Sequence, residues 1–180
     1  MQTRTALSLI ALAALTACAT QPMRAPFNQA DLPAAVQVPA GNKVALEHAA
    51  AGDVNYQCRA KKDMAGQFEW VFVGPDAKLM DRAGKTIGRY FGPPATWESN
   101  DGSKVTATQV AVAPAGAGNI PLQLVKANPA MGMGAMQGVT YIQRVKTQGG
   151  VAPAMACDAA KMGSKQIVNY QADYIFWRPV

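Results

Sequence analysis

Turn-forming residues divide this chain into short segments, and no segment has the apolar spacing of a long helix. The 180 residues include 16 glycines and 12 prolines. Between them, apolar residues alternate with polar ones, as in residues 54–59 (VNYQCR), or form short runs, as in residues 68–73 (FEWVFV). Alternation with a period of two is typical of a half-buried β-strand, and a short apolar run is typical of a strand buried on both faces.

The same pattern along the chain predicts about eight or nine short strands and at most one short helix. The helix is expected over residues 154–161, before Gly163, and Gly74-Pro75-Asp76 is expected to end the strand at 68–73. Short strands without an internal repeat predict an all-β fold, as a single antiparallel sandwich or a flattened barrel. The further strand candidates are residues 79–80, 87–91, 96–98, 103–112, 120–125, 139–145 and 169–177.

The first 17 residues have the composition of an export signal. Arg4 precedes the apolar run 6–15 (ALSLIALAAL), which is too short to span a bilayer as a permanent helix. The segment ends in Leu-Thr-Ala-Cys18, which resembles the lipobox of bacterial lipoproteins, so Cys18 is expected to carry the lipid. An ordinary signal peptide cut near Ala19 is the alternative. By the same resemblance, Ala19 rather than Asp after the cysteine favours the outer membrane, with the domain facing the periplasm.

The segment that follows is rich in proline and poor in large apolar residues, which favours extended conformations. Its prolines are Pro22, Pro26, Pro33 and Pro39. We therefore expect three parts: a lipoprotein signal peptide (1–17), a lipidated cysteine with a tether (18–39) and a β domain (40–180).

Two cysteines remain when Cys18 is used for lipid. Cys58 and Cys157 are an even pair in an oxidising compartment, and no Cys-x-x-Cys motif indicates redox chemistry. The sequence predicts a disulfide between them, with free thiols or a redox pair as the alternatives.

A series of landmarks occurs in a fixed order along the domain. It resembles the family described as domain of unknown function 3455, which occurs in exported bacterial and secreted fungal proteins, over residues 32–177. The resemblance names the domain and implies no catalytic residues. The landmarks are residues 56–58 (YQC), Trp70, 74–79 (GPDAKL), 96–98 (TWE), 101–103 (DGS), 141–145 (YIQRV), Thr147, 149–150 (GG), Pro153, Cys157 and 170–174 (YQADY).

The stretch 88–105 (GRYFGPPATWESNDGSKV) combines aromatic residues, a Gly-Pro-Pro corner, two acidic residues and an Asp-Gly turn within eighteen residues. Tyr90, Trp97, Glu98 and Asp101 are candidates for a binding surface, on which tryptophan would stack on a sugar. A hydrolytic interpretation makes Glu98 and Asp101 the acid and base, which requires both to face one pocket. A structural interpretation makes Asp101 part of a turn and Trp97 part of the core.

The second candidate site contains three methionines in residues 131–136 (MGMGAM). The thioethers of Met131, Met133 and Met136 would suit Cu(I), while a flexible, gap-filling loop is the alternative. The glycines in this region approach a dinucleotide fingerprint but lack the strand, helix and acidic residue that belong to it, so no nucleotide cofactor is expected.

No pattern in the sequence assembles a catalytic centre or a metal site. His48 is the single histidine, and we interpret it as a surface or structural residue whose hydrogen bonds are satisfied. The net charge of +6 is scattered, with the closest cluster at residues 59–62, and no basic helix indicates nucleic acid. We therefore expect a non-catalytic binding or envelope-associated module whose partners are the membrane, through Cys18, and a glycan or other envelope component. An enzyme acting on envelope carbohydrate and a copper-binding protein are the alternatives.

Overall fold

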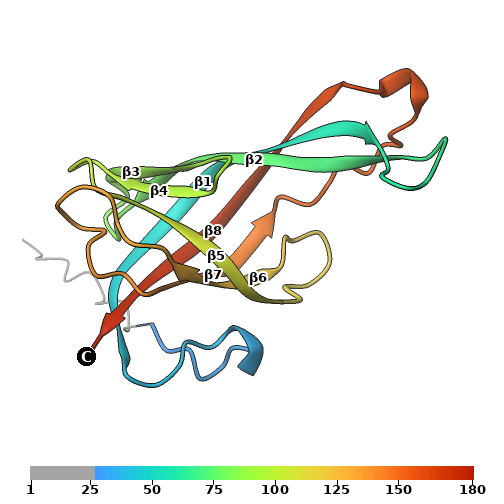
Figure 1. Ribbon diagram of the computed structural model, residues 1–180. Helices are drawn as coiled ribbons and strands as arrows, with labels where there is room; N and C mark the ends of the chain where they lie inside the picture. Colours follow the sequence, from blue (N-terminus) through green and yellow to red (C-terminus); the bar gives the residue numbers. More distant parts are fainter. Residues whose placement is uncertain (1–26) are drawn as a thin grey trace, which may run out of the picture.

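The structure is a computed structural model that describes residues 27–180, in which eight antiparallel strands form one closed barrel (Figure 1). Each strand pairs with its neighbours in sequence, and β1 pairs with β8 to close the ring. The prediction of an all-β fold is confirmed, in its barrel form. The strands are β1 (Asn42–Ala60), β2 (Phe68–Met80), β3 (Thr86–Phe91), β4 (Thr96–Ser99), β5 (Lys104–Ala113), β6 (Leu122–Ala127), β7 (Tyr141–Gly149) and β8 (Lys165–Pro179).

The barrel interior is filled by aromatic and aliphatic side chains. β8 shows the expected alternation, since Tyr170, Ala172, Tyr174 and Phe176 are all buried in the interior cluster. An eight-stranded barrel has an interior just wide enough for side chains to fill. The remaining buried members of this cluster are Ala50, Val54, Tyr56, Ala77, Leu79, Tyr90, Trp97, Val105, Val125, Met136, Val139 and Ile142.

A second apolar cluster lies on the outside of the barrel, beneath residues 27–41. This segment contains the 3-10 helix η1 (Ala34–Val36), and it buries Val36 and Val38 against outward-facing residues of β5–β8. The fully buried Gln143 fixes it in place, because its amide donates to the Val36 carbonyl (2.6 Å) and accepts from the Trp177 indole (2.8 Å). Residues 27–39 of the expected tether therefore pack on the domain. The signal peptide, Cys18 and the first part of the tether lie outside the described residues.

Part of the sheet extends beyond the barrel as an arm, which we define as residues 54–74 and 150–168 (Figure 1, upper right). It is formed by the end of β1, the start of β2 and the start of β8. β1 pairs with β2 as far as Ala60 opposite Phe68, and with β8 as far as Gln57 opposite Lys165. The expected break at residues 74–76 does not occur, and β2 continues through Pro75. At this point the register of the β1–β2 pairing shifts between Asn55 and Tyr56. The arm also explains why Phe72 is 52% exposed, although its segment has the apolar composition of a buried strand.

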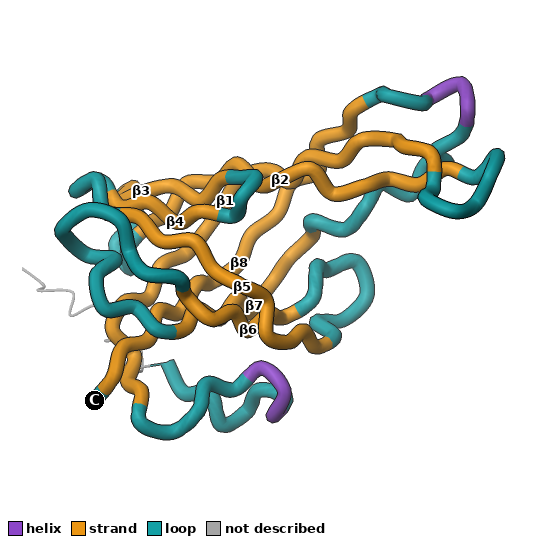
Figure 2. The backbone as a smooth tube through the Cα atoms, in the orientation of Figure 1, coloured by secondary structure: helices purple, strands orange, loops and turns teal. Residues whose placement is uncertain are grey.

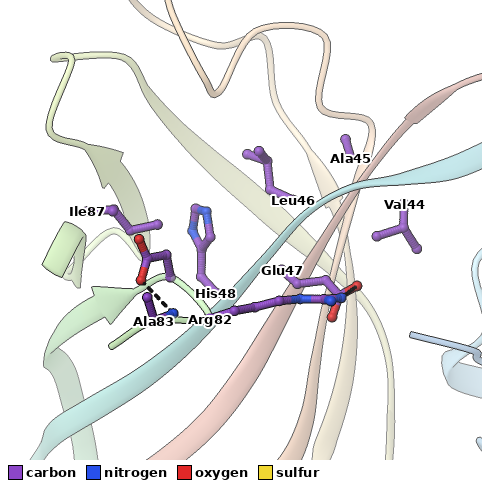
Figure 3. Close-up of a pocket in the computed structure, with 9 residues that line it drawn as sticks. Val44, Ala45, Leu46, Glu47, His48, Arg82, Ala83 and Ile87 are labelled. Atoms are coloured by element: carbon purple, nitrogen blue, oxygen red, sulfur yellow. Dashed lines mark hydrogen bonds and ion pairs between the residues drawn. The ribbon is translucent and has the colours of Figure 1, made fainter. Parts of the chain in front are cut away.

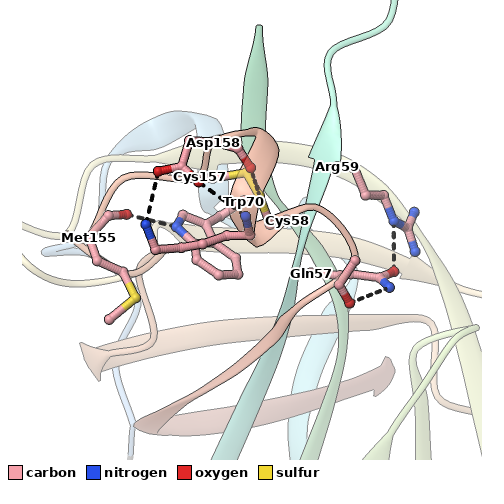
Figure 4. The surroundings of a disulfide bond; sticks show 9 residues. Gln57, Cys58, Arg59, Trp70, Met155, Cys157 and Asp158 are labelled. Atoms are coloured by element: carbon pink, nitrogen blue, oxygen red, sulfur yellow. Dashed lines mark hydrogen bonds and ion pairs between the residues drawn. A yellow bond between two sulfur atoms is a disulfide. The ribbon is translucent and has the colours of Figure 1, made fainter. Parts of the chain in front are cut away.

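A disulfide between Cys58 and Cys157 ties the two halves of the arm together, as predicted (Figure 4). The Cα atoms are 5.5 Å apart and the residues are 99 positions apart in sequence. Beside the bond, the Trp70 indole donates to the Met155 carbonyl (2.8 Å). The helix expected over residues 154–161 is reduced to one 3-10 turn, η2 (Ala159–Lys161). The disulfide therefore fixes the connection between β7 and β8 against the β1–β2 hairpin.

Candidate functional site

An open pocket of about 640 Å³ lies at the end of the barrel opposite the arm. It is formed where the start of β1 passes the β2–β3 turn (Figure 3). A second pocket of about 220 Å³ adjoins it and shares several of its lining residues. The lining is mixed, with five apolar and four polar or charged residues: Val44, Ala45, Leu46, Ala83 and Ile87, and Glu47, His48, Asp81 and Arg82.

His48 is the residue of this pocket whose environment is least expected. It lies opposite Tyr174 in the β1–β8 pairing and therefore points into the barrel, where its ring centroid is 5.0 Å from that of Phe176. The side chain is 7% exposed, and its buried Nδ1 atom has no hydrogen-bond partner. Burial lowers the pKa of His48 from 6.5 to about 4, a shift that the nearby Asp81 carboxylate opposes only in part. His48 is therefore neutral at pH 7, with a buried polar atom left unpaired, which costs about 1–3 kcal/mol.

The charged residues at the rim hold the backbone around the pocket. Oδ1 of Asp81 accepts hydrogen bonds from the N–H groups of Ala83 and Lys85, both at 2.9 Å, and so fixes the β2–β3 turn. Glu47 forms an ion pair with Arg82. Glu47 also accepts a hydrogen bond from the Phe27 N–H (3.3 Å), so the described chain begins beside this pocket.

The rest of this barrel end is covered by residues 128–140, the methionine loop (Figure 2). Met136 is fully buried in the interior cluster. Asp101 anchors the loop: Oδ2 accepts from the Ala135 N–H (2.7 Å), and Oδ1 accepts from the Ser103 hydroxyl (2.6 Å). The Ser103 hydroxyl in turn accepts from the Met136 N–H (3.0 Å). The hydrogen bonds that Asp101 accepts, with that from the Ser103 hydroxyl as the largest contribution, lower the pKa of Asp101 to about 2.

The four residues expected to form one binding surface are separated in the structure. Tyr90 and Trp97 are 4% and 2% exposed and stack on each other inside the barrel, with ring centroids 4.6 Å apart. Glu98 forms an ion pair with Arg89, its register partner on β3 (3.3 Å). Asp101 is committed to the methionine loop. The structural interpretation therefore describes Trp97 and Asp101, and neither Glu98 nor Asp101 lines the pocket at His48.

The three methionines of the suggested copper site do not share one environment. Met136 is fully buried, whereas Met131 and Met133 are 45% and 78% exposed. The Met133 sulfur accepts a hydrogen bond from the Gln137 side chain (2.8 Å). Within residues 27–180, no group of three or more His, Cys, Asp and Glu residues is placed to hold a metal ion.

His48 is the residue that sequence reasoning missed, because it was interpreted as exposed or satisfied. The signal that could have found it is the alternation of β1. The inward-facing series that contains Val54, Tyr56 and Cys58 extends backward in steps of two through Ala50 to His48. Alternation alone therefore places His48 on the inner face.

The single histidine provides a direct test of the pocket environment. We expect the imidazole of His48 to titrate in the folded protein near pH 4, because burial disfavours its charged form. Between about pH 6.5 and 4 the unfolded chain binds more protons than the folded one. Stability therefore decreases as the pH falls through this window, by up to about 3 kcal/mol.

NMR of the imidazole signals measures the titration, and urea denaturation at several pH values measures the stability. The variant His48→Gln should lose the pH dependence in this window. A midpoint near 6.5 in the folded wild-type protein would contradict the buried placement.

The methionine loop supplies a matched pair of variants. Met136→Ala should lower the free energy of unfolding by about 2–5 kcal/mol, because it leaves a cavity in the interior. Met133→Ala, three positions away and 78% exposed, should change it by less than about 0.5 kcal/mol. Urea denaturation of both variants checks this expectation, and equal effects would show that Met136 does not close the barrel.

One protein family model matches most of this chain. A family model described as "Protein of unknown function (DUF3455)" matches residues 39–178, which cover β1 to β7, β8 up to Arg178, the pocket residues and both cysteines of the disulfide. Comparison with curated proteins finds no match, and comparison with solved structures finds none either. In the described part of the chain, no helix has the length and apolarity needed to cross a membrane. The chain belongs to the DUF3455 family.

Proposed function

We propose that this protein is a non-catalytic binding module of the bacterial cell envelope, and that the pocket at His48 is its ligand site. In this proposal a lipid on Cys18 anchors the protein to the outer membrane, and the barrel faces the periplasm. The observation that carries the proposal is the open pocket itself, which has a mixed lining and sits beside a buried, unpaired imidazole nitrogen. Pockets of this volume that combine apolar walls with a few convergent polar groups are the usual form of small-ligand sites.

The lining indicates the chemistry of the ligand. Leu46 and Ile87 offer aliphatic contacts, and the Glu47–Arg82 ion pair offers a polar rim. Val44 lines the pocket from the outer side of β1, where it packs against the second apolar cluster. A compact amphipathic envelope component, with an aliphatic part and a hydroxyl or amide group, matches this combination. Because a neutral imidazole can pair with a hydroxyl or amide, such a group would satisfy Nδ1 of His48 once the buried ring turns toward the pocket.

The electrostatics of the pocket support binding over acid–base chemistry. A general base works best when its pKa is close to the working pH, and the pKa of His48 is about 4. Asp81 uses its carboxylate to hold the turn, and Glu47 is engaged by Arg82 and by the Phe27 N–H. The carbohydrate-enzyme alternative required Glu98 and Asp101 to face one pocket, and they have separate partners.

The position of Phe27 links the pocket to the proposed anchor. Only eight residues separate Cys18 from Phe27, and a chain of this length spans at most about 32 Å. Because Phe27 is hydrogen-bonded to Glu47, a lipid on Cys18 would keep the pocket end of the barrel within that distance of the membrane surface. The ligand we propose is therefore a component of the envelope near that surface.

The pocket proposal predicts a localised response to envelope fragments. Titration of isotope-labelled protein with soluble muropeptides and lipopolysaccharide oligosaccharides should shift the amide signals of Leu46, His48, Ala83 and Ile87. The variant Ala83→Trp should abolish the response, because Ala83 lines the pocket on an exposed turn and a larger side chain would occupy the space.

Ala117→Trp is the matched control, since Ala117 is an exposed alanine on the β5–β6 connection, away from this pocket. Shifts that survive Ala83→Trp, or that are lost equally in Ala117→Trp, would show that the ligand site is elsewhere. The absence of any response across the panel would contradict an envelope-fragment ligand.

The anchor has its own test, which is independent of the pocket. We expect the intact mass of the native protein to correspond to removal of residues 1–17 and addition of lipid at Cys18. Reduction should add two hydrogens, because Cys58 and Cys157 form the disulfide. A mature chain that begins near Ala19 without lipid would contradict the membrane anchor and leave the pocket proposal standing.

A further inference from the structure

Exposed apolar side chains are concentrated on the arm. The described residues include eleven large hydrophobic side chains that are exposed. Six of them belong to the arm, although the arm is a small part of the chain. Single exposed apolar residues are ordinary, but their concentration in one projecting element indicates an interaction surface. The six are Met64, Phe72, Val151, Met155, Met162 and Ile167.

The three methionines of this group lie on two turns at the outer end of the arm. Met64 belongs to the β1–β2 turn, and Met155 and Met162 belong to the β7–β8 connection. Both turns lie at the same end of the molecule (Figure 2). The disulfide joins them, and backbone bonds between Cys58 and residues 163–164 (2.9 and 3.0 Å) continue the link. The methionines are 50%, 50% and 65% exposed, and their backbone is held in place.

The charges around these methionines are mainly positive. Between residues 59 and 69 and between 155 and 167 there are five cations and three anions, so the net charge is 5 − 3 = +2. One pair, Lys161 and Asp158, forms an ion pair (3.0 Å). Lysine and arginine side chains beside exposed apolar residues match an anionic lipid surface, where the apolar groups enter the headgroup layer and the cations contact phosphate. The remaining charged residues are Arg59, Lys61, Lys62, Lys165, Asp63 and Glu69.

We propose that the end of the arm docks onto the surface of an anionic lipid bilayer. In this arrangement Met64, Met155 and Met162 enter the interfacial layer, and the neighbouring lysines bind lipid phosphates. A bilayer is favoured over a protein partner because the apolar side chains stand on separate turns. Methionine is flexible and adapts to a deformable surface, whereas a protein interface needs a contiguous, shape-matched core.

This docking is distinct from the anchor at Cys18. β1 runs the length of the molecule, from Asn42 near the pocket to Ala60 on the arm. Nineteen residues of strand extend about 60 Å, so the proposed docking end is remote from Phe27. The arm therefore provides a second point of membrane contact, at the end of the domain away from the anchor.

The test uses the mature chain from Ala19, so that no lipid contributes to binding. All eight strands, both apolar clusters and the disulfide lie within residues 27–180, so this chain contains the whole described fold. It would be secreted behind a cleavable signal to allow the disulfide to form. Co-sedimentation with vesicles of phosphatidylcholine and phosphatidylglycerol should retain the protein, and vesicles of phosphatidylcholine alone should retain much less.

Two arm variants separate the apolar and charge contributions. Met64→Ser with Met162→Ser should weaken binding to the anionic vesicles roughly tenfold, because two interfacial side chains are lost. Lys61→Glu with Lys62→Glu should weaken it by roughly tenfold or more, because two attractive charges become repulsive. The matched control is Met131→Ser with Met133→Ser, which removes two exposed methionines at the opposite end of the barrel and should leave binding unchanged.

Thermal unfolding of each variant would confirm that the fold is retained, since all six substituted residues lie outside the eight strands. Failure of the parent chain to bind anionic vesicles would overturn the proposal. So would arm variants that bind as well as the parent, or a control variant that loses binding to the same extent.

Discussion

Pairing between the first and last strands is the interaction on which the rest of this structure depends. β1 and β8 pair from Asn42 opposite Pro179 to Gln57 opposite Lys165, with one shift of register between Val44 and Leu46, and this ladder closes the barrel. The same ladder continues beyond the barrel as the central part of the arm. β1 therefore places His48 at one end of the molecule and Cys58 at the other. Near its middle, a side chain at Gly52 would collide with the backbone at Asp76, so glycine permits the close approach of β2.

The aromatic interior restricts where a ligand can bind. Tyr90, Trp97 and Tyr174 contact one another across the barrel, with centroids 4.6–5.5 Å apart. Burial raises the pKa values of Tyr90 and Tyr174, so both hydroxyls stay neutral. Because the centre is filled, the two proposed surfaces lie at the ends of the barrel. One end carries the pocket at His48, and the other carries the arm, so the proposed binding and docking surfaces do not compete for space.

Sequence patterns predicted the class of fold because they reflect local constraints. Alternation in β1 and β8 follows directly from one face being buried. The disulfide was predicted from the pair of cysteines that remains when Cys18 is assigned to the expected lipid. Closure of the barrel was harder to predict, because alternation indicates that one face of a strand is buried and does not indicate which strand lies beside it. The arm was missed for a related reason: residues 68–73 have the composition of a buried strand, yet they extend past the barrel.

The environments of the candidate site residues were harder to predict, because they arise from contacts between distant segments. The roles of Asp101 and Met136 depend on a loop that returns more than thirty residues later. The stretch 88–105 was predicted as a binding surface because of its unusual residues, and those residues are mainly structural. Trp97 is in the core, and Asp101 holds the methionine loop. The pocket at His48 is composed mostly of ordinary residues, and only the barrel brings them together.

The β1–β8 pairing also determines how much of the chain must be available before the fold can be completed. The ring cannot close until the last strand is available to pair with β1. The disulfide cannot form until Cys157, 99 positions after Cys58, is available. A chain that emerges with its N-terminus first would therefore carry a β1 paired with β2 on one edge only, and a free Cys58 thiol, until almost the whole chain has emerged. Any product that stops before Cys157 would keep both, and would present to proteases and chaperones the open strand edge that the complete protein covers.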